Sequence, residues 1–315
     1  MSRGGETLVF KARAKVNLFL EVLGRRENGY HDIRSVLVPV SLHDVVRLEG
    51  TDGEIETVMS GAVCSNGSQH CVPASADNLA TRAATAMKRM TGAEGGVRIT
   101  IEKHIPIGGG LGGGSADAAA VLVGLNRLWN KRLSASNLME IGASLGCDIP
   151  AMVYGGTVRM EGLGETIKPI ALKPQGRTAS WGVVIVNPGF SVLTRDIYER
   201  CTVSLTARDE LYRKMISAME EGDLEMASRS LFNGLQETVC RKFPLIGIVA
   251  EEVQKAGALG VLVSGSGASV FGLARDEAEA GQIAARLSSC DLPIWSVVAR
   301  IVPDGVMVAH GPLEA

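Results

Sequence analysis

The sequence predicts an α+β fold with two domains. Strand and helix patterns are mixed along the chain, without the strict alternation of a doubly wound sheet. The chain has 315 residues, and a domain takes roughly 100–200 residues. Gly, Pro and Lys cluster at about residues 162–182, a composition typical of a domain boundary. We therefore predict domains at residues 1–170 and 171–315.

The composition is that of a nearly neutral chain that can fold around a core. Hydrophobic residues make up 46% of the sequence and charged residues 21%. The net charge of −2 and the lack of a long basic run give no reason to expect a nucleic-acid or membrane partner. The six cysteines form no Cys-x-x-Cys pair, which predicts reduced thiols rather than a zinc site. No signal-peptide pattern follows Met1, so we expect a cytoplasmic protein.

The first half of the chain is predicted to contain four strands and three helices. Strand-forming residues predict strands at 9–23, 36–48, part of 50–76, and 96–103. Asp77 and Ser134 are good N-cap residues, and apolar residues at helical spacing follow each of them. A further helical pattern begins after a glycine-rich segment near Ser115. The order there is strand, glycine-rich loop, helix.

The second half is predicted to be richer in helices. Helical patterns occur at about 208–221, 224–240, 245–256 and 276–288. A strand begins near Trp181, and two short strands are expected after the last helix. The uncharged run 256–274 is nearly long enough for a membrane span, but it contains five Gly and three Ser. We interpret it as two strands around the turn Ser264–Ser269.

The glycine-rich loop is the strongest functional signal in the sequence. Six of its seven residues 108–114 are glycine. So many glycines cost backbone entropy, which favours a functional reason for them. Without side chains, backbone N–H groups can approach phosphate oxygens, and the helix N-terminus adds its dipole. Ser115 is placed where a hydroxyl could reach a phosphate or a magnesium ion.

Four other interpretations of this loop are weaker. A Walker A loop requires a Lys before the Ser or Thr, and Gly114 stands there instead. A dinucleotide fingerprint requires an acid about 20 residues further on, and none lies between Asp117 and Glu140. The His-Arg-Asp and Asp-Phe-Gly motifs of protein kinases do not occur. A flexible linker is disfavoured by the ordered patterns on both sides of the loop.

The chain resembles the GHMP kinases, a family named for galactokinase, homoserine kinase, mevalonate kinase and phosphomevalonate kinase. Five motifs of the family occur in the expected order over nearly the whole chain. One segment is similar to the nucleotide-binding loop of the family and consists of Pro106, Ile107, Gly108, Gly109, Gly110, Leu111, Gly112, Gly113, Gly114, Ser115 and Ala116. The other four motifs of the family are matched by residues 14–20, 28–31, 145–150 and 264–269.

The resemblance implies a fold, an activity and cofactors. The fold would be the two-domain GHMP kinase fold, with an N-terminal ribosomal-S5-like nucleotide-binding domain and a C-terminal ferredoxin-like α/β-plait domain. The activity would be transfer of the γ-phosphoryl group of ATP to a hydroxyl, with Mg²⁺ present. Ser115 is the candidate metal ligand. The Gly-Gly-Gly-Leu-Gly-Gly-Gly-Ser form of the loop is typical of members that act on a cytidyl diphosphate sugar alcohol.

The resemblance also assigns roles to side chains outside the loop. Asp148 would abstract or orient the proton of the attacking hydroxyl, and Lys15 would polarise the same centre. Tyr30 and His31 would hold the cytosine end of the substrate, with Tyr198 on the other face of the base. Two further polar contacts to the substrate are assigned to Asn17 and Thr194.

Three alternatives remain open from the sequence. The first is another small-molecule kinase of the same family, of the homoserine or mevalonate type; the Gly29-Tyr30-His31 motif favours the cytidyl substrate. The second is a binding module that keeps the loop but does not catalyse a reaction; the presence of both Lys15 and Asp148 disfavours it. The third is a dinucleotide-dependent oxidoreductase, which the missing acid disfavours. We expect a monomer or a homodimer.

Overall fold

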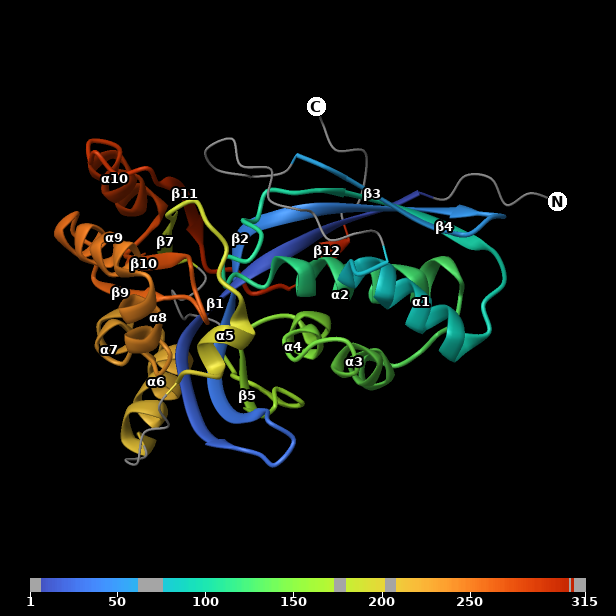
Figure 1. The fold of residues 1–315 in the computed structure, drawn as a ribbon, viewed down its shortest axis with the longest axis horizontal. Helices are drawn as coiled ribbons and strands as arrows, with labels where there is room; N and C mark the ends of the chain where they lie inside the picture. The colour runs from blue at the N-terminus through green and yellow to red at the C-terminus, as the bar shows by residue number, and fades with distance from the viewer. Residues whose placement is uncertain (1–6, 62–75, 173–179, 202–207, 306, 309–315) are drawn as a thin grey trace.

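Two β-sheets form the framework of the molecule (Figure 1). The computed structural model describes residues 7–61, 76–172, 180–201, 208–305 and 307–308. Within these ranges the larger sheet has eight strands, in the order β12-β1-β2-β4-β3, with β5 and β6 continuing from β2 and β8 beside β1. Its strands are β1 (Thr7–Arg25), β2 (His31–Thr51), β3 (Ile55–Ser60), β4 (Gly96–Glu102), β5 (Val158–Gly162), β6 (Thr166–Pro169), β8 (Phe232–Asn233) and β12 (Met307–Val308).

The smaller sheet is antiparallel, with the order β11-β7-β10-β9 in the described residues. Its strands are β7 (Gly182–Asn187), β9 (Gly260–Val263), β10 (Val270–Ala274) and β11 (Trp295–Arg300). In chain order these are the first to the fourth strands, so their spatial order is fourth, first, third, second. Helices connect the first strand to the second and the third to the fourth, as in a ferredoxin-like unit. The predicted α+β fold with a plait at its C-terminal end is confirmed.

The helices divide between the two sheets. Figure 1 shows α1 and α2 along the larger sheet, and α9 and α10 at the other end of the molecule beside the smaller sheet. The helices are α1 (Leu79–Thr91), α2 (Gly113–Leu128), α3 (Ala135–Ala143), α4 (Ile149–Tyr154), α5 (Thr194–Tyr198), α6 (Asp209–Glu221), α7 (Leu224–Arg229), α8 (Gln236–Lys242), α9 (Pro244–Lys255) and α10 (Glu277–Leu287). None of them combines the length and apolar character that a membrane span needs.

Strand β1 runs through all three large hydrophobic cores. Its early residue Phe10 packs with α1 and α2, and Val16 belongs to the core that joins the two sheets. Val22 belongs to the core beneath α9 and α10. Because alternate residues of a strand face opposite sides, Lys15 and Asn17 point away from the face that buries Val16. The middle of β1 therefore presents these two polar side chains to the region between the two parts of the molecule.

The two sheets share a core. Val183 and Ile185 of β7 pack with β1 and β2, whereas Val184 of the same strand packs with α9 and α10. Strands β1 to β6 belong to the larger sheet, and β7 begins the smaller one after residues 173–179, which lie outside the described residues; β8 and β12 return to the larger sheet. The division into domains at residues 1–170 and 171–315 stays a prediction.

Local signals placed several helix ends correctly. The side chain of Asn78 accepts a hydrogen bond from the first turn of α1, one residue after the expected cap at Asp77. Ser134 and Asn137 form a reciprocal capping box at α3. The helix after the glycine-rich loop begins at Gly113, within two residues of the expected start.

Other expectations were wrong where long-range contacts decide the structure. The pattern at 224–240 predicted one helix, but α7 and α8 are separated by β8, which pairs with β1. The Asn233 side chain stabilises this break by donating to the carbonyl groups of Val263 (2.8 Å) and Gly265 (2.7 Å). The sequence also gave no sign of α4, α5, β5 or β6. Strand β2 continues through Pro39, which lies where the β1–β2 register shifts.

Some of the sequence predictions concern residues outside the described ranges. The strand predicted in part of 50–76 is β3, and the rest of that segment falls largely on residues 62–75, where Cys64 and Cys71 lie as well. The cysteines that the structure describes, at positions 147, 201, 240 and 290, are free thiols.

Candidate active site

The glycine-rich loop connects β4 to α2 and is held tightly against its neighbours. Gly110 has a φ of 76°, and a Cβ atom there would lie 2.1 Å from the carbonyl oxygen of Ser264. Gly112 has a φ of 69°, and its Cβ would lie 2.9 Å from Cγ of Lys15. Both positions therefore require glycine for two reasons, a left-handed backbone and close packing. The Lys15 backbone N–H also donates to Leu111 O at 2.9 Å, which ties the loop to β1.

The turn Ser264–Ser269 forms one wall behind this loop. It connects β9 to β10, so the predicted pair of strands around this turn is confirmed. The Ser264 hydroxyl donates to Gly110 O at 3.0 Å. The Ser269 backbone N–H donates to Gly109 O, also at 3.0 Å. The turn thus fixes the carbonyl side of the loop.

The segment before α5 holds the loop from another direction. The Ser191 hydroxyl donates to Ile107 O at 2.8 Å, and the Val192 backbone N–H donates to Gly108 O at 3.1 Å. Two segments from the second half of the chain thus hold a loop from the first half. Sequence reasoning did not single out Ser191, although it lies in the same stretch as the predicted Thr194.

Lys15 and Asp148 lie side by side next to this loop. Their side chains form an ion pair, with Lys15 Nζ 3.3 Å from Asp148 Oδ2. The Lys15 side chain is 5% exposed and that of Asp148 is 30% exposed. A Cβ atom at Gly265 would lie 3.5 Å from Lys15 Nζ, so this ammonium group also borders the hairpin turn. Ammonium, carboxylate and glycine-rich loop thus meet at one place.

Asp148 lies in the short turn between α3 and α4, at the N-cap position of α4. Pro150 stands in the first turn of α4, where its missing N–H costs nothing. In the described structure the Asp148 carboxylate does not accept a hydrogen bond from that first turn. The carboxylate is therefore oriented by Lys15, with its oxygens partly open to solvent.

Asn17 lies beside Lys15 and holds it. Lys15 Nζ donates to Asn17 Oδ1 at 2.8 Å, and Asn17 Nδ2 donates to Ser35 Oγ at 2.9 Å. The Ser35 hydroxyl in turn donates to Phe19 O at 2.7 Å. Both side-chain groups of the buried Asn17 are thus engaged within the protein. Ser35 was not recognised from the sequence, because its role depends on the pairing of β1 with β2.

His31 and Tyr198 pair across two segments far apart in the sequence. Their ring centroids are 5.5 Å apart, with an angle of 39° between the planes. Burial, with the nearby Arg25 as a smaller cause, lowers the pKa of His31. Burial raises the pKa of Tyr198, and the negative charge of Asp148 adds to the rise. Tyr198 is thus in ring contact with His31 and within electrostatic reach of Asp148.

The remaining predicted residues are placed differently. Tyr30 is 60% exposed on the β1–β2 hairpin and is not part of the His31–Tyr198 pair. Thr194 begins α5 and shares a hydrogen bond of 2.9 Å with the hydroxyl of Ser266. Ser115 lies half-buried in the first turn of α2.

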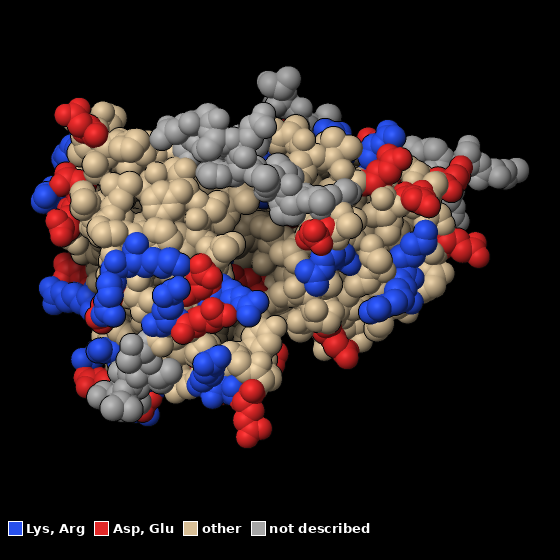
Figure 2. Space-filling view, in the orientation of Figure 1, with Lys and Arg blue, Asp and Glu red and all other residues tan. Residues whose placement is uncertain are grey.

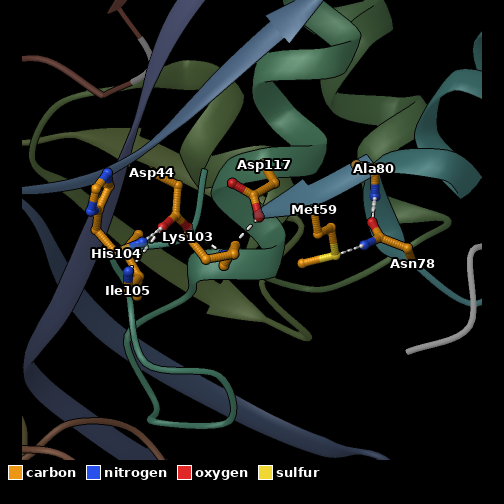
Figure 3. Close-up of polar contacts among 8 residues, drawn as sticks. All are labelled: Asp44, Met59, Asn78, Ala80, Lys103, His104, Ile105 and Asp117. Atoms are coloured by element: carbon orange, nitrogen blue, oxygen red, sulfur yellow. Dashed lines mark hydrogen bonds and ion pairs between the residues drawn. The ribbon is translucent and has the colours of Figure 1, made fainter. Parts of the chain in front are cut away.

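A buried ionic cluster lies behind the glycine-rich loop (Figure 3). Lys103 Nζ donates to a carboxylate oxygen of Asp44 and, at 2.7 Å, to Asp117 Oδ2. Burial raises the pKa of Asp117 to about 7, against the opposing charge of Lys103. Sequence reasoning missed all three residues. Two signals could have indicated this cluster. One is the charged Lys103 at the end of an alternating strand, and the other is Asp117 among small helical residues.

The space-filling view shows one face of the region around the site. Figure 2 shows a hollow at the middle of this face, between the part that carries the smaller sheet and the part that carries α1 and α2. Basic and acidic side chains both lie near its lower edge in this view. Among the described residues, no three His, Cys, Asp or Glu side chains are grouped as metal ligands would be.

Comparison with known proteins gives this arrangement a family. Residues 78–156 match the GHMP kinases N terminal domain, and residues 215–291 match the GHMP kinases C terminal domain. The 4-diphosphocytidyl-2-C-methyl-D-erythritol kinase of Caldicellulosiruptor bescii is 38% identical over 277 residues, covering 88% of this chain and 93% of that protein. The enzyme of the same name from Geobacillus thermodenitrificans is 39% identical over 266 residues, covering 84% of this chain and 88% of that protein.

Solved structures agree with the sequence comparison. A 4-(cytidine 5'-diphospho)-2C-methyl-D-erythritol kinase superposes with a TM-score of 0.72 at 32% identity, covering 93% of this chain and 99% of that one. A homoserine kinase from Cytophaga hutchinsonii superposes with a TM-score of 0.76 at 18% identity, covering 98% of this chain and 99% of that one, a likeness of fold alone.

The chain belongs to the GHMP kinase family and is a small-molecule kinase that uses ATP. Both relatives described above carry the same name, 4-diphosphocytidyl-2-C-methyl-D-erythritol kinase.

Proposed function

We propose that this protein phosphorylates the C2 hydroxyl of 4-diphosphocytidyl-2-C-methyl-D-erythritol with ATP. The products are the 2-phosphate and ADP, in the non-mevalonate route to isopentenyl diphosphate. Relatives of that name at 35–39% identity over most of the chain support this substrate. The observation that carries the proposal is the Lys15–Asp148 ion pair, 3.3 Å apart, beside the glycine-rich loop.

The proposed chemistry needs positioning and charge stabilisation more than covalent catalysis. The glycine-rich loop and the N-terminus of α2 would bind the phosphates of ATP, because both present backbone N–H groups. The substrate hydroxyl would attack the γ-phosphorus while its proton passes to Asp148. The bond to the β–γ bridging oxygen would break and release ADP. Lys15 would stabilise the negative charge on the transferred group.

Mg²⁺ is part of the proposal. Ser115 is the proposed ligand of this ion. It lies half-buried in the first turn of α2, directly after the loop that is proposed to bind the phosphates. Mg²⁺ takes few protein ligands and completes its shell with water and phosphate oxygens, which suits a site with a single hydroxyl. When bound, the ion would neutralise charge on the phosphates.

The His31–Tyr198 pair is our proposed site for the cytosine base. Two aromatic rings at 5.5 Å provide a stacking surface, and the neutral imidazole offers a nitrogen that accepts hydrogen bonds. Thr194 at the start of α5 and Tyr30, next to His31 in the sequence, are proposed as further contacts. Asn17 is proposed to act mainly through Lys15, because its amide already bonds Lys15 and Ser35.

A substrate panel tests the proposed function. Purified protein is assayed for ADP formation with ATP, Mg²⁺ and one of three acceptors: the cytidyl diphosphate sugar alcohol, homoserine or mevalonate. We expect turnover with the cytidyl substrate alone. Turnover with homoserine or mevalonate in its place would reject this substrate and leave the family assignment intact.

A further inference from the structure

The three charged residues of the buried cluster connect both ends of the glycine-rich loop (Figure 3). Asp44 of β2 holds the entry: its Oδ1 accepts from the backbone N–H groups of His104 (2.6 Å) and Ile105 (2.8 Å), directly before Pro106. Lys103 at the end of β4 donates to Asp44 and to Asp117. Asp117 belongs to α2, which leaves the loop. The cluster thus joins strand β2, the loop entry and the helix in one hydrogen-bonded unit.

The cluster lies immediately below the loop exit. A Cβ atom at Gly113, the first residue of α2, would lie 3.3 Å from Lys103 Nζ. The three side chains are at most 5% exposed, so solvent scarcely screens their mutual attraction. Asp117 Oδ1 is buried and has no hydrogen-bond partner among the described residues. The hydrogen bond that Asp117 makes therefore runs through its other oxygen, Oδ2, to Lys103.

Global stability alone gives a weak reason for such a cluster. Burying charges carries a large desolvation cost, and apolar replacements of buried ion pairs are often neutral or stabilising. The distinctive property of the cluster is geometric, since it fixes two backbone segments on either side of a loop with six glycines. Glycine loses more conformational freedom on ordering than any other residue. The loop has almost no side chains of its own by which it could be anchored.

We propose that Asp44, Lys103 and Asp117 are positioning residues that hold the glycine-rich loop in its nucleotide-binding shape before ATP arrives. This inference rests on ATP binding at the loop, which is part of the proposed function. A preorganised loop binds more tightly because less ordering remains to be done when the ligand binds. Loosening the cluster should therefore weaken ATP binding without changing the site for the cytidyl substrate.

The test compares Asp117→Ala with Asp117→Asn. In Asp117→Ala the link to α2 is lost, while the Lys103–Asp44 pair remains. We expect the Kd for ATP–Mg²⁺, measured by calorimetry, to rise about tenfold. The KM for the cytidyl substrate should change less than about twofold. In Asp117→Asn the side-chain amide oxygen still accepts a hydrogen bond from Lys103. The Kd of this variant for ATP–Mg²⁺ should therefore lie within about twofold of the wild-type value.

Two controls separate positioning from simple destabilisation. Glu56→Ala removes an exposed ion pair with Arg98 on the same sheet, and its Kd for ATP–Mg²⁺ should equal that of the wild type. Amide hydrogen exchange on nucleotide-free wild-type protein should show protection at the backbone N–H groups of Lys15, Val192 and Ser269, which donate to carbonyl groups of the loop. That protection should fall in Asp117→Ala, while Leu122 and Leu125 in the middle of α2 stay protected.

Two results would overturn the inference. One is a lower melting temperature in Asp117→Ala with an unchanged Kd for ATP–Mg²⁺, which indicates a structural role only. The other is fast exchange of these three anchoring amides in the wild type, which shows that the loop is not ordered in advance. If the wild type does not bind ATP by calorimetry, the proposed nucleotide site itself fails, an outcome distinct from both.

Discussion

The ammonium group of Lys15 lies 3.3 Å from Oδ2 of Asp148, although one residue comes from β1 and the other from the N-cap of α4. Asp148→Asn keeps the shape of the side chain and removes its basicity. We expect kcat to fall by about 10²–10⁴-fold, the usual contribution of a general base, or further if the charge also orients Lys15.

Binding measurements complete this experiment. The Kd for ATP–Mg²⁺ of Asp148→Asn should stay within about threefold of the wild-type value, since the carboxylate is not part of the loop. Asp209→Asn, a change at an exposed acid of α6, is the matched control and should keep full activity. Near-normal turnover in Asp148→Asn would remove the proposed mechanism.

Asn17 allows a substrate-contact role to be distinguished from an orienting role. Its side chain holds Lys15 at 2.8 Å and is itself held by Ser35 at 2.9 Å. We expect Asn17→Ala to lower kcat by about tenfold or more, because Lys15 loses its orientation, with little change in the KM for the cytidyl substrate. Ser35→Ala removes only the next link and should have a smaller effect of the same kind. A raised KM with normal kcat in Asn17→Ala would instead identify a substrate contact.

Gly110 is the position in the loop where a side chain is least tolerable. Its φ of 76° costs roughly 1–2 kcal/mol for any other L-residue, and the added Cβ would lie 2.1 Å from Ser264 O. Gly110→Ala should lower the free energy of unfolding by about 2 kcal/mol or more and weaken ATP binding. Chemical denaturation measures the first effect and calorimetry the second.

Gly281→Ala provides the contrasting substitution. It lies within α10, and its Cβ would meet no atom within 4 Å. Stability should rise by about 0.5–1 kcal/mol, because alanine is the better helix former. Equal effects of the two substitutions would show that the close approach of the loop to Ser264 is not maintained in solution.

The ring of Tyr198 should matter for the cytidyl substrate and not for ATP. Stacking of an aromatic side chain on a base contributes about 1–3 kcal/mol, so Tyr198→Ala should raise the KM for the cytidyl substrate about tenfold. Tyr198→Phe retains the ring and should stay close to the wild type. Tyr154→Ala, at a 43% exposed tyrosine, is the matched control. An unchanged KM in Tyr198→Ala would place the base elsewhere.

The lowered pKa of His31 makes a prediction about pH. Burial disfavours the imidazolium, so His31 stays neutral above its ordinary pKa of 6.5 and for some distance below it. A neutral ring nitrogen can accept a hydrogen bond, and protonation removes that acceptor. The kcat/KM for the cytidyl substrate should therefore hold as pH falls to 6.5 and decline below it. In His31→Gln this decline should be absent while the pH profile for ATP is unchanged; the same decline in both proteins would exclude His31.

Local sequence signals were reliable where neighbouring residues decide the structure. Side-chain hydrogen bonds of Asn78 and Ser134 fix the starts of α1 and α3, and both caps fell within one residue of the expected positions. The glycine-rich loop could be recognised because the left-handed backbone at Gly110 and Gly112 excludes other residues. The order of the five motifs was sufficient for the family, since each motif is short and continuous in the chain.

Contacts between distant segments were not predictable in the same way. The helix expected at 224–240 is broken because Phe232 and Asn233 pair with β1, and nothing within that segment specifies its partner. Asn17, an expected substrate contact, is bonded to Lys15 and Ser35, and its bond to Ser35 depends on the pairing of β1 with β2.

The sequence by itself determined which chemical groups this protein has and the local backbone that carries them: a glycine-rich loop with accessible backbone N–H groups, a lysine and a carboxylate. It also determined the kinase family. Only the tertiary structure decided which groups meet, including Lys15 with Asp148 and Lys103 with both Asp44 and Asp117. The physical reason is that strand register and sheet packing bring together residues far apart in the chain. Those contacts depend on the whole hydrophobic core and not on any single segment.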